Sequence, residues 1–464
     1  MRSYIPRAVV AVTAAATIAL AGCSSSDDGG GSSAAGEGSD GGSGSISFAM
    51  GSNDADKVKP LIEKWNQTHP DQQVEFKELP ADADGQHDKL VQSLQAGNDD
   101  YDVMALDVTW TAEFAANGWI APLEGDLALD TSQLLPATVE SATYNGKLYA
   151  GPQNTNAQLL YYRTDLVEQA PATWDDLTAS CDKAKTAGVD CMVTQLKNYE
   201  GLTVNATQFI NSWGGSVVGP DGKTPTVDSP EAKAGLTALV DGYNSDVIAK
   251  RSNGFDEEAT NNAFVNGEAM YAYNWPYMYD NADSDGSGDK PKSAVQGKFA
   301  VAPIVGENGP GASTLGGYNL AINVNSKAKN TALDFIRFME SPDSQMSFAE
   351  NAFPPVLASI YDDPTLAEKY PYMPVLKTAL ENAKPRPVTP FYSAVSKGIR
   401  DNVYAALTAG KSIDQAVTDI STVIKNATSN QPGSPRGAIG ENGDDEEDGW
   451  ICRGRRRPGR GRSH

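Results

Sequence analysis

The segment Ile46–Asp107 reads ISFAMGSNDADKVKPLIEKWNQTHPDQQVEFKELPADADGQHDKLVQSLQAGNDDYDVMALD, with three short apolar runs separated by two stretches of helical spacing. It predicts alternating strands and helices over Ile46–Met50, Val58–His69, Val74–Leu79, Leu90–Ala96 and Tyr101–Leu106. Such a βαβαβ order implies a mainly parallel sheet with helices on both faces. Ligands of such sheets lie beyond the carboxyl ends of the strands, so binding chemistry is expected at Asp107.

The start of the chain is typical of secretion. Arg2 and Arg7 precede an apolar run that ends in Leu-Ala-Gly-Cys at Cys23. This pattern predicts a signal peptide over residues 1–22. The last four residues resemble a bacterial lipobox, which implies that Cys23 is lipidated and holds an extracytoplasmic protein to the cell membrane. The alternative is an ordinary signal peptide followed by a stray cysteine.

Composition divides the rest of the chain into a body and two flanking segments. Residues 23–45, mostly Ser, Gly, Asp and Ala, predict a flexible tether. Residues 431–464, an acidic run followed by an arginine-rich run, predict a disordered tail. The body between them, about 380 residues, exceeds what one hydrophobic core usually serves, so two lobes are expected.

Charge and histidine content exclude several classes of function. The net charge of −23 repels phosphate backbones, so we expect no nucleic-acid partner for the body. The body contains only His69 and His87, both in polar surroundings, which leaves little material for a histidine-based metal site or catalytic triad. We therefore expect no metal and no cofactor.

The cysteines fit an oxidising compartment. With Cys23 assigned to lipid and Cys452 in the tail, Cys181 and Cys191 remain, ten positions apart. A local disulfide between them is predicted. Two buried free thiols are the alternative.

Six segments of the body are similar, in order, to segments of one protein family. They read YDVMALDVTWTAEFAANGWIAPL (101–123), GKLYAGPQNTNAQLLYYRTDL (146–166), TWDDL (173–177), AFVNGEAMYAYNWPYMY (263–279), LGGYNLAINVNSK (315–327) and RPVTPFYSAVSKGIRDNVYAALTAGKSIDQAV (386–417). Together they resemble the sugar-binding lipoproteins of ABC importers, and among these most closely the trehalose and maltose binders.

The resemblance implies a fold and a function. The fold is the two-lobed α/β fold of periplasmic binding proteins, each lobe a mainly parallel sheet flanked by helices, with the hinge crossed more than once. One lobe is expected over 46–151 plus 299–341, the other over 152–298 plus 342–430. A monomer would close its lobes on an oligosaccharide, such as trehalose or maltose, and deliver it to the permease subunits of an ABC importer.

A sugar site needs groups that hydrogen-bond hydroxyls and a flat aromatic side chain for the ring. Asp107 can accept from two neighbouring hydroxyls, unless it instead caps the following helix. The resemblance implies that Trp275, in an Asn-Trp-Pro-Tyr segment shared with the family, is the platform. Pro276 disfavours helix there, which suits a displayed side chain, although a large aromatic residue can also be core. Arg386, between two prolines, presents a rigid fork of donors; a surface salt bridge is its alternative role.

The remaining candidates follow from the family resemblance. One of Glu257 and Glu258 is expected to contact the sugar, as is one of Asn154 and Asn156. Glu200 belongs either to the cleft or to the structure. The resemblance also implies Asn53, just after the first strand, and the segment Gly316–Tyr318, where glycine lets the backbone come close to the ligand. The full set of candidates is Asn53, Asp107, Asn154, Asn156, Glu200, Glu257, Glu258, Trp275, Gly316, Gly317, Tyr318 and Arg386.

Two other functions remain open from sequence. The first is a glycoside hydrolase that uses a carboxylate pair such as Asp107 with Glu257. Hydrolysis needs an acid with a raised pKa and a positioned water, and no motif marks either, so an enzyme is not expected. The second is a cleft that captures a non-sugar solute such as a cation or a peptide.

Overall fold

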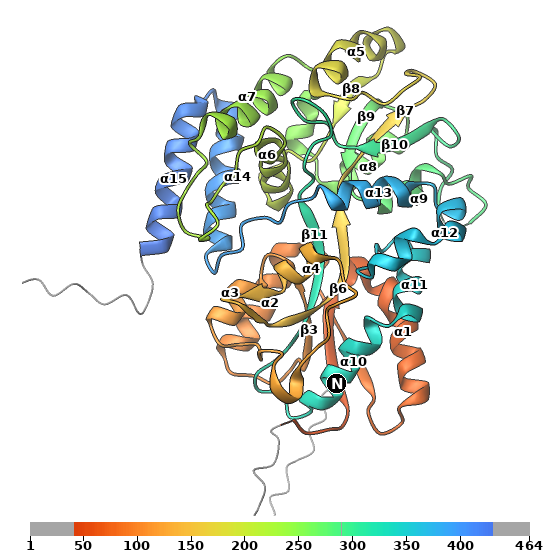
Figure 1. Cartoon of the computed structure of the whole chain (residues 1–464). Helices are drawn as coiled ribbons and strands as arrows, with labels where there is room; N and C mark the ends of the chain where they lie inside the picture. The colour runs from red at the N-terminus through yellow and green to blue at the C-terminus, as the bar shows by residue number, and fades with distance from the viewer. Residues whose placement is uncertain (1–40, 289, 430–464) are drawn as a thin grey trace, which may run out of the picture. The chain divides into compact units, whose positions relative to one another are not determined.

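Two β-sheets form the centre of the computed structural model, which describes residues 41–288 and 290–429 (Figure 1). The predicted signal peptide, Cys23 and the tail 431–464 lie outside the described residues. The first sheet has the strand order β2-β1-β3-β11-β6 and the second β10-β7-β9-β8. The strands of the first sheet are β1 (Ile46–Gly51), β2 (Val74–Leu79), β3 (Val103–Asp107), β6 (Ala150–Ala157) and β11 (Leu315–Ile322). Those of the second are β7 (Leu159–Arg163), β8 (Asp190–Val193), β9 (Ala269–Asn274) and β10 (Phe299–Pro303), and a small hairpin pairs β4 (Thr143–Tyr144) with β5 (Lys147–Leu148).

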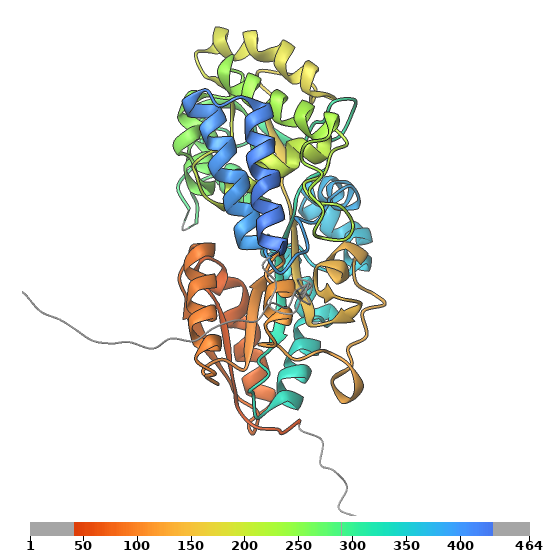
Figure 2. The ribbon, with the colours of Figure 1, turned by 90° about the vertical axis from the view of Figure 1, so that its left-hand side faces the viewer.

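Helices surround both sheets, and α14 and α15 lie side by side (Figure 2). The α-helices are α1 (Ala55–Thr68), α2 (Ala83–Gln95), α3 (Thr111–Ala116), α4 (Pro136–Ser141), α5 (Trp174–Ala187), α6 (Glu200–Ser212), α7 (Pro230–Asn244), α8 (Glu257–Val265), α9 (Tyr277–Ala282), α10 (Lys329–Met339), α11 (Pro342–Glu350), α12 (Pro364–Lys369), α13 (Tyr372–Glu381), α14 (Tyr392–Ala409) and α15 (Ile413–Ser429). Short 3₁₀ turns are η1 (Ser52–Asp54), η2 (Gly125–Leu127), η3 (Lys250–Gly254) and η4 (Ala358–Asp362).

The sheets are mixed, which corrects the expectation of mainly parallel sheets. In the first sheet β1 pairs in parallel with β2 and β3, as the βαβαβ segment predicts. However, β11 is antiparallel to both β3 and β6. In the second sheet only the pairing of β8 with β9 is parallel among the described strands. The antiparallel strands come from segments far apart in the chain, so the local pattern does not reveal their direction.

Both predicted helices of the first segment begin earlier than expected. The first begins at Ala55 rather than Val58, and the second at Ala83 rather than Leu90. The early turns of α2 are polar and carry no apolar periodicity. They are held instead by the side chain of Asp82, which accepts from the backbone N–H of Gly85 at 2.7 Å as a helix N-cap.

The chain passes between the sheets later than the predicted boundaries at 151, 299 and 341. Strand β6 stays in the first sheet as far as Ala157, and β7 begins the second sheet at Leu159. Strand β10 pairs with β7, so the return follows Pro303. Phe348 still packs in the core of the first sheet. The limits of the lobes otherwise stay a prediction.

The crossing residue Gln158 is anchored on one side. Its side chain is fully buried, donates to Gln195 Oε1 at 2.8 Å and accepts from Gln208 Nε2 at 3.0 Å. Gln195 follows β8 and Gln208 lies on α6, so both partners are on the side of the second sheet. Buried amides that are paired at both nitrogen and oxygen rigidify their surroundings.

The predicted disulfide joins Cys181 on α5 to Cys191 on β8. The helix α5 and the strand β8 that it links pack together in the core of the second sheet, where Cys191 is buried. A cross-link here restricts the unfolded chain over a short loop.

Replacing both cysteines with serine is expected to lower the free energy of unfolding by roughly 3 kcal/mol, the chain-entropy value for so short a loop. Urea unfolding of the wild type and the double variant measures this. Reductant should shift the wild-type midpoint toward that of the variant and leave the variant unchanged. An identical midpoint for reduced and oxidised wild type would contradict the prediction.

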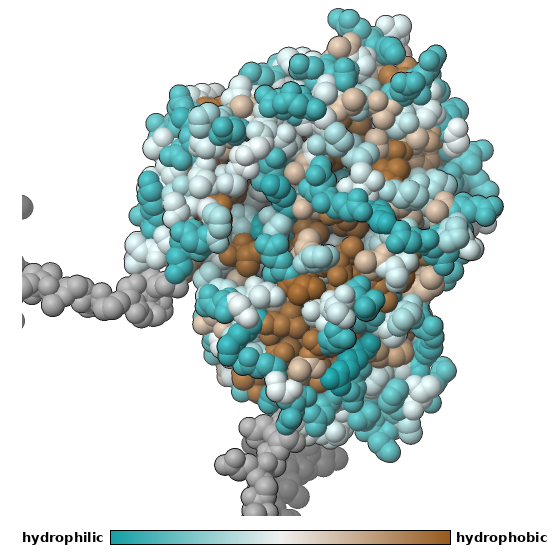
Figure 3. Space-filling view, in the orientation of Figure 1, coloured by the Kyte–Doolittle hydropathy of each residue, from teal (hydrophilic) through white to brown (hydrophobic). Residues whose placement is uncertain are grey.

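The surface is largely hydrophilic, with apolar residues gathered around α4 and β6 in the view of Figure 3. Among the described residues, Val324 is the one large hydrophobic side chain that is strongly exposed, at 41%. Within the same residues, no helix combines the length and the apolar character that crossing a membrane requires.

Candidate functional site

A buried arginine links the end of the first sheet to the second half of the protein. Arg386 Nη2 lies 3.1 Å from Asp107 Oδ1 at the end of β3, and Arg386 Nη1 lies 2.7 Å from Glu200 Oε1 at the start of α6. Arg386 is 4% exposed. The predicted alternative of a surface salt bridge is therefore wrong in its location: the salt bridges exist, but they are buried.

The electrostatics of this cluster favour a charged arginine. Burial lowers the pKa of Arg386, but the nearby Asp107, Tyr392 and Glu200 raise it by more. Its Nε has no hydrogen-bond partner among the described residues. The two carboxylates therefore pair with Nη1 and Nη2 of the guanidinium and leave its Nε–H without a partner.

The carboxylate of Glu200 has internal partners on both oxygens. Oε1 accepts from Arg386 and from the hydroxyl of Tyr392, and Oε2 accepts from Ser396 Oγ at 2.5 Å. Tyr392 and Ser396 lie on the first turns of α14. These contacts favour the structural interpretation of Glu200, which positions Arg386.

Asp107 does not cap the following helix. Helix α3 begins at Thr111 and has no side-chain cap. Instead, Asp107 Oδ1 accepts from the backbone N–H of Thr109 at 3.0 Å and from its hydroxyl at 2.8 Å. This turn and Arg386 both use Oδ1, which leaves Oδ2 to accept from a ligand.

Strand β11 places the glycine-rich segment beside the two asparagines. Gly317 has φ +113°, and a Cβ there would lie 2.3 Å from the carbonyl oxygen of Asn154, so only glycine fits. Asn154 Oδ1 accepts from the backbone N–H of Tyr318 at 3.1 Å, while its buried Nδ2 has no partner among the described residues. Asn156 pairs with Gly316 in the sheet, and its Oδ1 has no partner within the same residues.

Trp275 follows β9 and precedes α9, in the irregular position that Pro276 predicts. Its side chain is half-buried, and a Cβ built on Gly316 would lie 3.0 Å from its ring. The indole therefore lies directly beside β11. Its backbone is fixed, because its carbonyl accepts from the hydroxyl of Tyr161 at 3.0 Å.

Glu257 and Glu258 begin α8 and differ in their surroundings. Glu257 Oε2 accepts from the hydroxyl of Tyr199 at 2.6 Å, whereas Glu258 is exposed. Burial raises the pKa of Glu257, and hydrogen bonds from Tyr199 and Trp275 partly offset this. Since Glu257 adjoins the indole, it is the better candidate of the two.

Asn53 lies in a polar cluster just after β1. The sequence predicted Asn53 and Tyr318 of this cluster but not its other members. Asn53 Nδ2 donates to Asp54 Oδ2 at 2.6 Å and is 3.4 Å from the hydroxyl of Tyr318, and Gln86 Nε2 donates to Asn53 Oδ1 at 3.2 Å. Asp54 and Gln86 were missed because each looks like an ordinary helix-end or helix-surface residue. Tyr199, Tyr392 and Ser396 were missed for the same reason.

Burial raises the pKa of Asp54 from 3.8 to about 6, against the opposing attraction of Lys57. The folded protein thus binds this proton more tightly than the unfolded chain. The associated stability is present below about pH 4 and is lost as the pH rises through about 6.

We therefore expect Asp54→Asn, which keeps the shape but not the charge, to raise the melting temperature near pH 7.5 and to leave it almost unchanged near pH 4. Thermal unfolding at the two pH values tests this. Asp71→Asn, at an exposed position, serves as the control and should show no such difference. Equal shifts for Asp54→Asn at both pH values would contradict the assignment.

The predicted residues thus form two connected groups that meet at β11. Asn53, Asp107 and Asn154 adjoin Tyr318, and Asp107 leads on to Arg386 and Glu200. Trp275 adjoins Gly316 and leads on to Glu257. Within the described residues, no group of three His, Cys, Asp or Glu side chains is arranged to hold a metal ion.

Comparison with known proteins assigns the family. Residues 51–346 match the bacterial extracellular solute-binding protein family, and the chain belongs to it. This is a family of binding proteins and not of enzymes. A probable ABC transporter-binding protein of Deinococcus radiodurans is 33% identical over 353 residues, which cover 72% of this chain and 82% of that protein.

Solved structures share the two-lobed binding-protein fold. Maltose-bound MalE3 of T. maritima is 36% identical with a TM-score of 0.75, covering 82% of this chain and 99% of that one. The cyclic α-maltosyl-1,6-maltose binding protein of Arthrobacter globiformis is 22% identical with a TM-score of 0.71 over 84% of this chain and all of that one, a likeness of fold. The family and the two-lobed α/β fold expected from the sequence motifs are confirmed, with mixed rather than mainly parallel sheets.

Proposed function

We propose that the protein binds a small carbohydrate, an α-linked disaccharide such as trehalose or maltose, between its lobes and delivers it to the permease of an ABC importer. One observation carries the proposal. The indole of Trp275, which follows β9 of the second sheet, lies beside Gly316 of strand β11. Asp107, at the end of β3 in the first sheet, pairs with Tyr318 of the same strand and holds the buried Arg386.

The chemistry of these groups suits a sugar. The half-buried ring of Trp275 can cover the C–H face of a pyranose. The acceptor Asn156 Oδ1 and the donors Asn154 Nδ2 and Arg386 Nε have no partner among the described residues, and such groups match hydroxyls that both donate and accept. The likeness to a maltose-bound protein at 36% identity supports the same class of ligand.

Lobe closure and membrane anchoring complete the proposal. A ligand shifts the balance between open and closed lobes by its different affinity for the two states, and the closed form docks on the permease. Cys23 would carry the acyl chains that hold the protein at the membrane. Cys23→Ala should then release the protein into the medium, which fractionation measures.

Calorimetry with trehalose, maltose and mannitol tests the ligand class. We expect a disaccharide to bind with a micromolar dissociation constant, about −8 kcal/mol, and to be recovered intact. Mannitol is included because a mannitol-binding protein of Pseudomonas aeruginosa is 25% identical to this chain. Tighter binding of mannitol, or no binding of any sugar, would overturn the disaccharide proposal.

A further inference from the structure

Two buried glutamines contact the segments on which the chain crosses between the two sheets, one from each side. Gln208 lies on α6, whose apolar side chains pack in the core of the second sheet. Gln345 lies on α11, whose Phe348 packs in the core of the first sheet. Both glutamine side chains are at most 1% exposed. Each is thus fixed to a different lobe.

Gln208 joins two crossing segments to α6. Its Nε2 donates to Gln158 Oε1 at 3.0 Å, at the step from β6 to β7. Its Oε1 accepts from the backbone N–H of Thr314 at 3.2 Å, directly before β11. Thr314 Oγ1 also donates to the carbonyl of Val204 on the same helix at 3.2 Å. The lobe of the second sheet therefore holds both strands where they enter it.

Gln345 holds the crossing from the lobe of the first sheet. Its Nε2 donates to the carbonyl of Gln153 on β6 at 2.8 Å, and its Oε1 accepts from the backbone N–H of Val356 at 2.7 Å. The register of β6 on β11 shifts at Gln153, which has no partner on that strand. Such a bulge interrupts the ladder of a sheet, and here a buried amide fixes it.

Four residues of β6, 154–157, lie between these two fixed points. They pair with residues 315–318 of β11, where Gly317 has φ +113°. We call these two paired runs the hinge ladder. Because its ends are held by opposite lobes, a change in the angle between the lobes must be taken up within it.

We propose that Gln208 and Gln345 are positioning residues that confine lobe closure to the hinge ladder. The inference rests on the proposed function, since it requires lobes that close on a ligand. Asn154 and Asn156, the sugar-contact candidates of β6, lie within the hinge ladder. A bend there turns both side chains relative to the lobes, so closure and sugar contact are coupled through the same four residues.

Gln208→Met and Gln345→Met remove these hydrogen bonds and nearly preserve the volume of the side chain. In each ligand-free variant, amide hydrogen exchange over the hinge ladder should accelerate about tenfold or more, because one end is no longer held. Affinity for maltose, or for trehalose if maltose does not bind, should fall about threefold or more, mainly through slower association. The reason is that a smaller fraction of the ligand-free protein is competent to bind. Calorimetry and stopped-flow tryptophan fluorescence measure these two quantities.

Asn323→Leu is the matched control for the loss of a buried amide. Asn323 is 1% exposed, and its Nδ2 donates to the carbonyls of Asn98 and Tyr101 at 3.1 and 2.9 Å, all on the side of the first sheet. This variant should lower the melting temperature, as a purely structural residue does. It should leave exchange in the hinge ladder and the sugar affinity unchanged.

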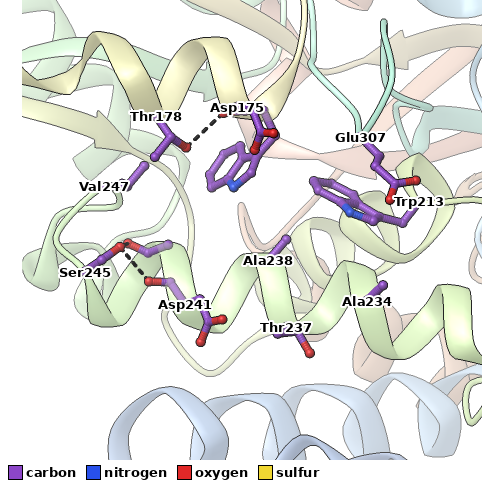
Figure 4. A pocket seen from close by; sticks show the side chains of 12 residues that line it. Asp175, Thr178, Trp213, Ala234, Thr237, Ala238, Asp241, Ser245, Val247 and Glu307 are labelled. Carbon is purple, nitrogen blue, oxygen red and sulfur yellow. Dashed lines mark hydrogen bonds between the residues drawn. The ribbon is translucent and has the colours of Figure 1, made fainter.

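A second control concerns the pocket of about 500 Å³ that α5 and α7 line (Figure 4). None of residues 153–158 and 313–318 lines it. Its volume is that of a small-molecule site, so a sugar held there would add a signal unrelated to closure. Ala238→Trp, which fills this pocket, should leave the measured affinity unchanged.

Thermal unfolding first establishes that each variant is folded. Gln208→Asn, which keeps the amide but shortens its reach, replaces Gln208→Met if the latter is not. Unchanged exchange in the hinge ladder of both folded variants would overturn the inference, as would equal acceleration by Asn323→Leu. Sugar binding by the wild type and equally by both variants would overturn it and leave the proposed function standing. If the wild type binds no disaccharide, the proposed function fails, and the exchange comparison alone decides the role of the two glutamines.

Discussion

Replacing Trp275 with alanine is expected to weaken disaccharide binding more than tenfold, at least about 1.4 kcal/mol. The indole supplies the flat surface of the predicted site and is fixed beside Gly316, so its removal leaves a sugar face in contact with water. An anchor of this kind commonly contributes more than its share of the binding energy. Calorimetric titration of wild type and variant with the same sugar measures the loss.

Trp119→Ala is the matched control, because Trp119 is also half-buried but packs edge-on against Phe114, at 5.4 Å, beside the first sheet. This variant should keep wild-type affinity even if it unfolds at a lower temperature. Wild-type affinity in Trp275→Ala, with the fold intact, would remove Trp275 from the site.

Arg386→Met is expected to lower the free energy of unfolding by about 3 kcal/mol or more, because it leaves two partly buried carboxylates without their counter-ion. Sugar affinity should fall with it, since Asp107 loses the group that positions it. Urea unfolding and calorimetry on the same preparations provide the two readouts.

The chain offers a close control in Arg251, which also bridges two carboxylates, Asp190 at 2.7 Å and Glu268 at 2.6 Å, but is 42% exposed. Arg251→Met should cost less than about 1 kcal/mol, as surface ion pairs do. Equal destabilisation by the two substitutions would show that burial of Arg386 does not increase the contribution of its ion pairs to stability.

Local pattern was enough to predict the elements that pair with their neighbours in sequence. Strands β1, β2 and β3 lie within one or two residues of their predicted positions, because their apolar runs are short and bounded by polar turns. The polar start of α2 and the antiparallel direction of β11 were not predictable. The first depends on a cap, and the second on a pairing between segments about 200 residues apart in the chain.

The candidate site shows the same division. The place of Asp107 after a strand, the prolines beside Trp275 and Arg386 and the family resemblance led to these three residues as candidates, and their contact with a sugar stays a prediction. Their mutual arrangement could not be predicted, since Arg386 and Asp107 are separated by 279 positions. Asp54 and Tyr199 carry no sequence signal, because only burial distinguishes them from surface residues of the same type.

The unpaired amide of Asn154 bears on how this protein can evolve. The amide oxygen of that side chain accepts from the backbone of β11, while the amide nitrogen has no partner among the described residues. Exchange for aspartate would keep the acceptor on which the strand relies and turn a donor into an acceptor on the opposite side. In the proposed sugar site, selection could therefore alter which molecule is preferred through a single side chain of this kind, while the scaffold is inherited unchanged.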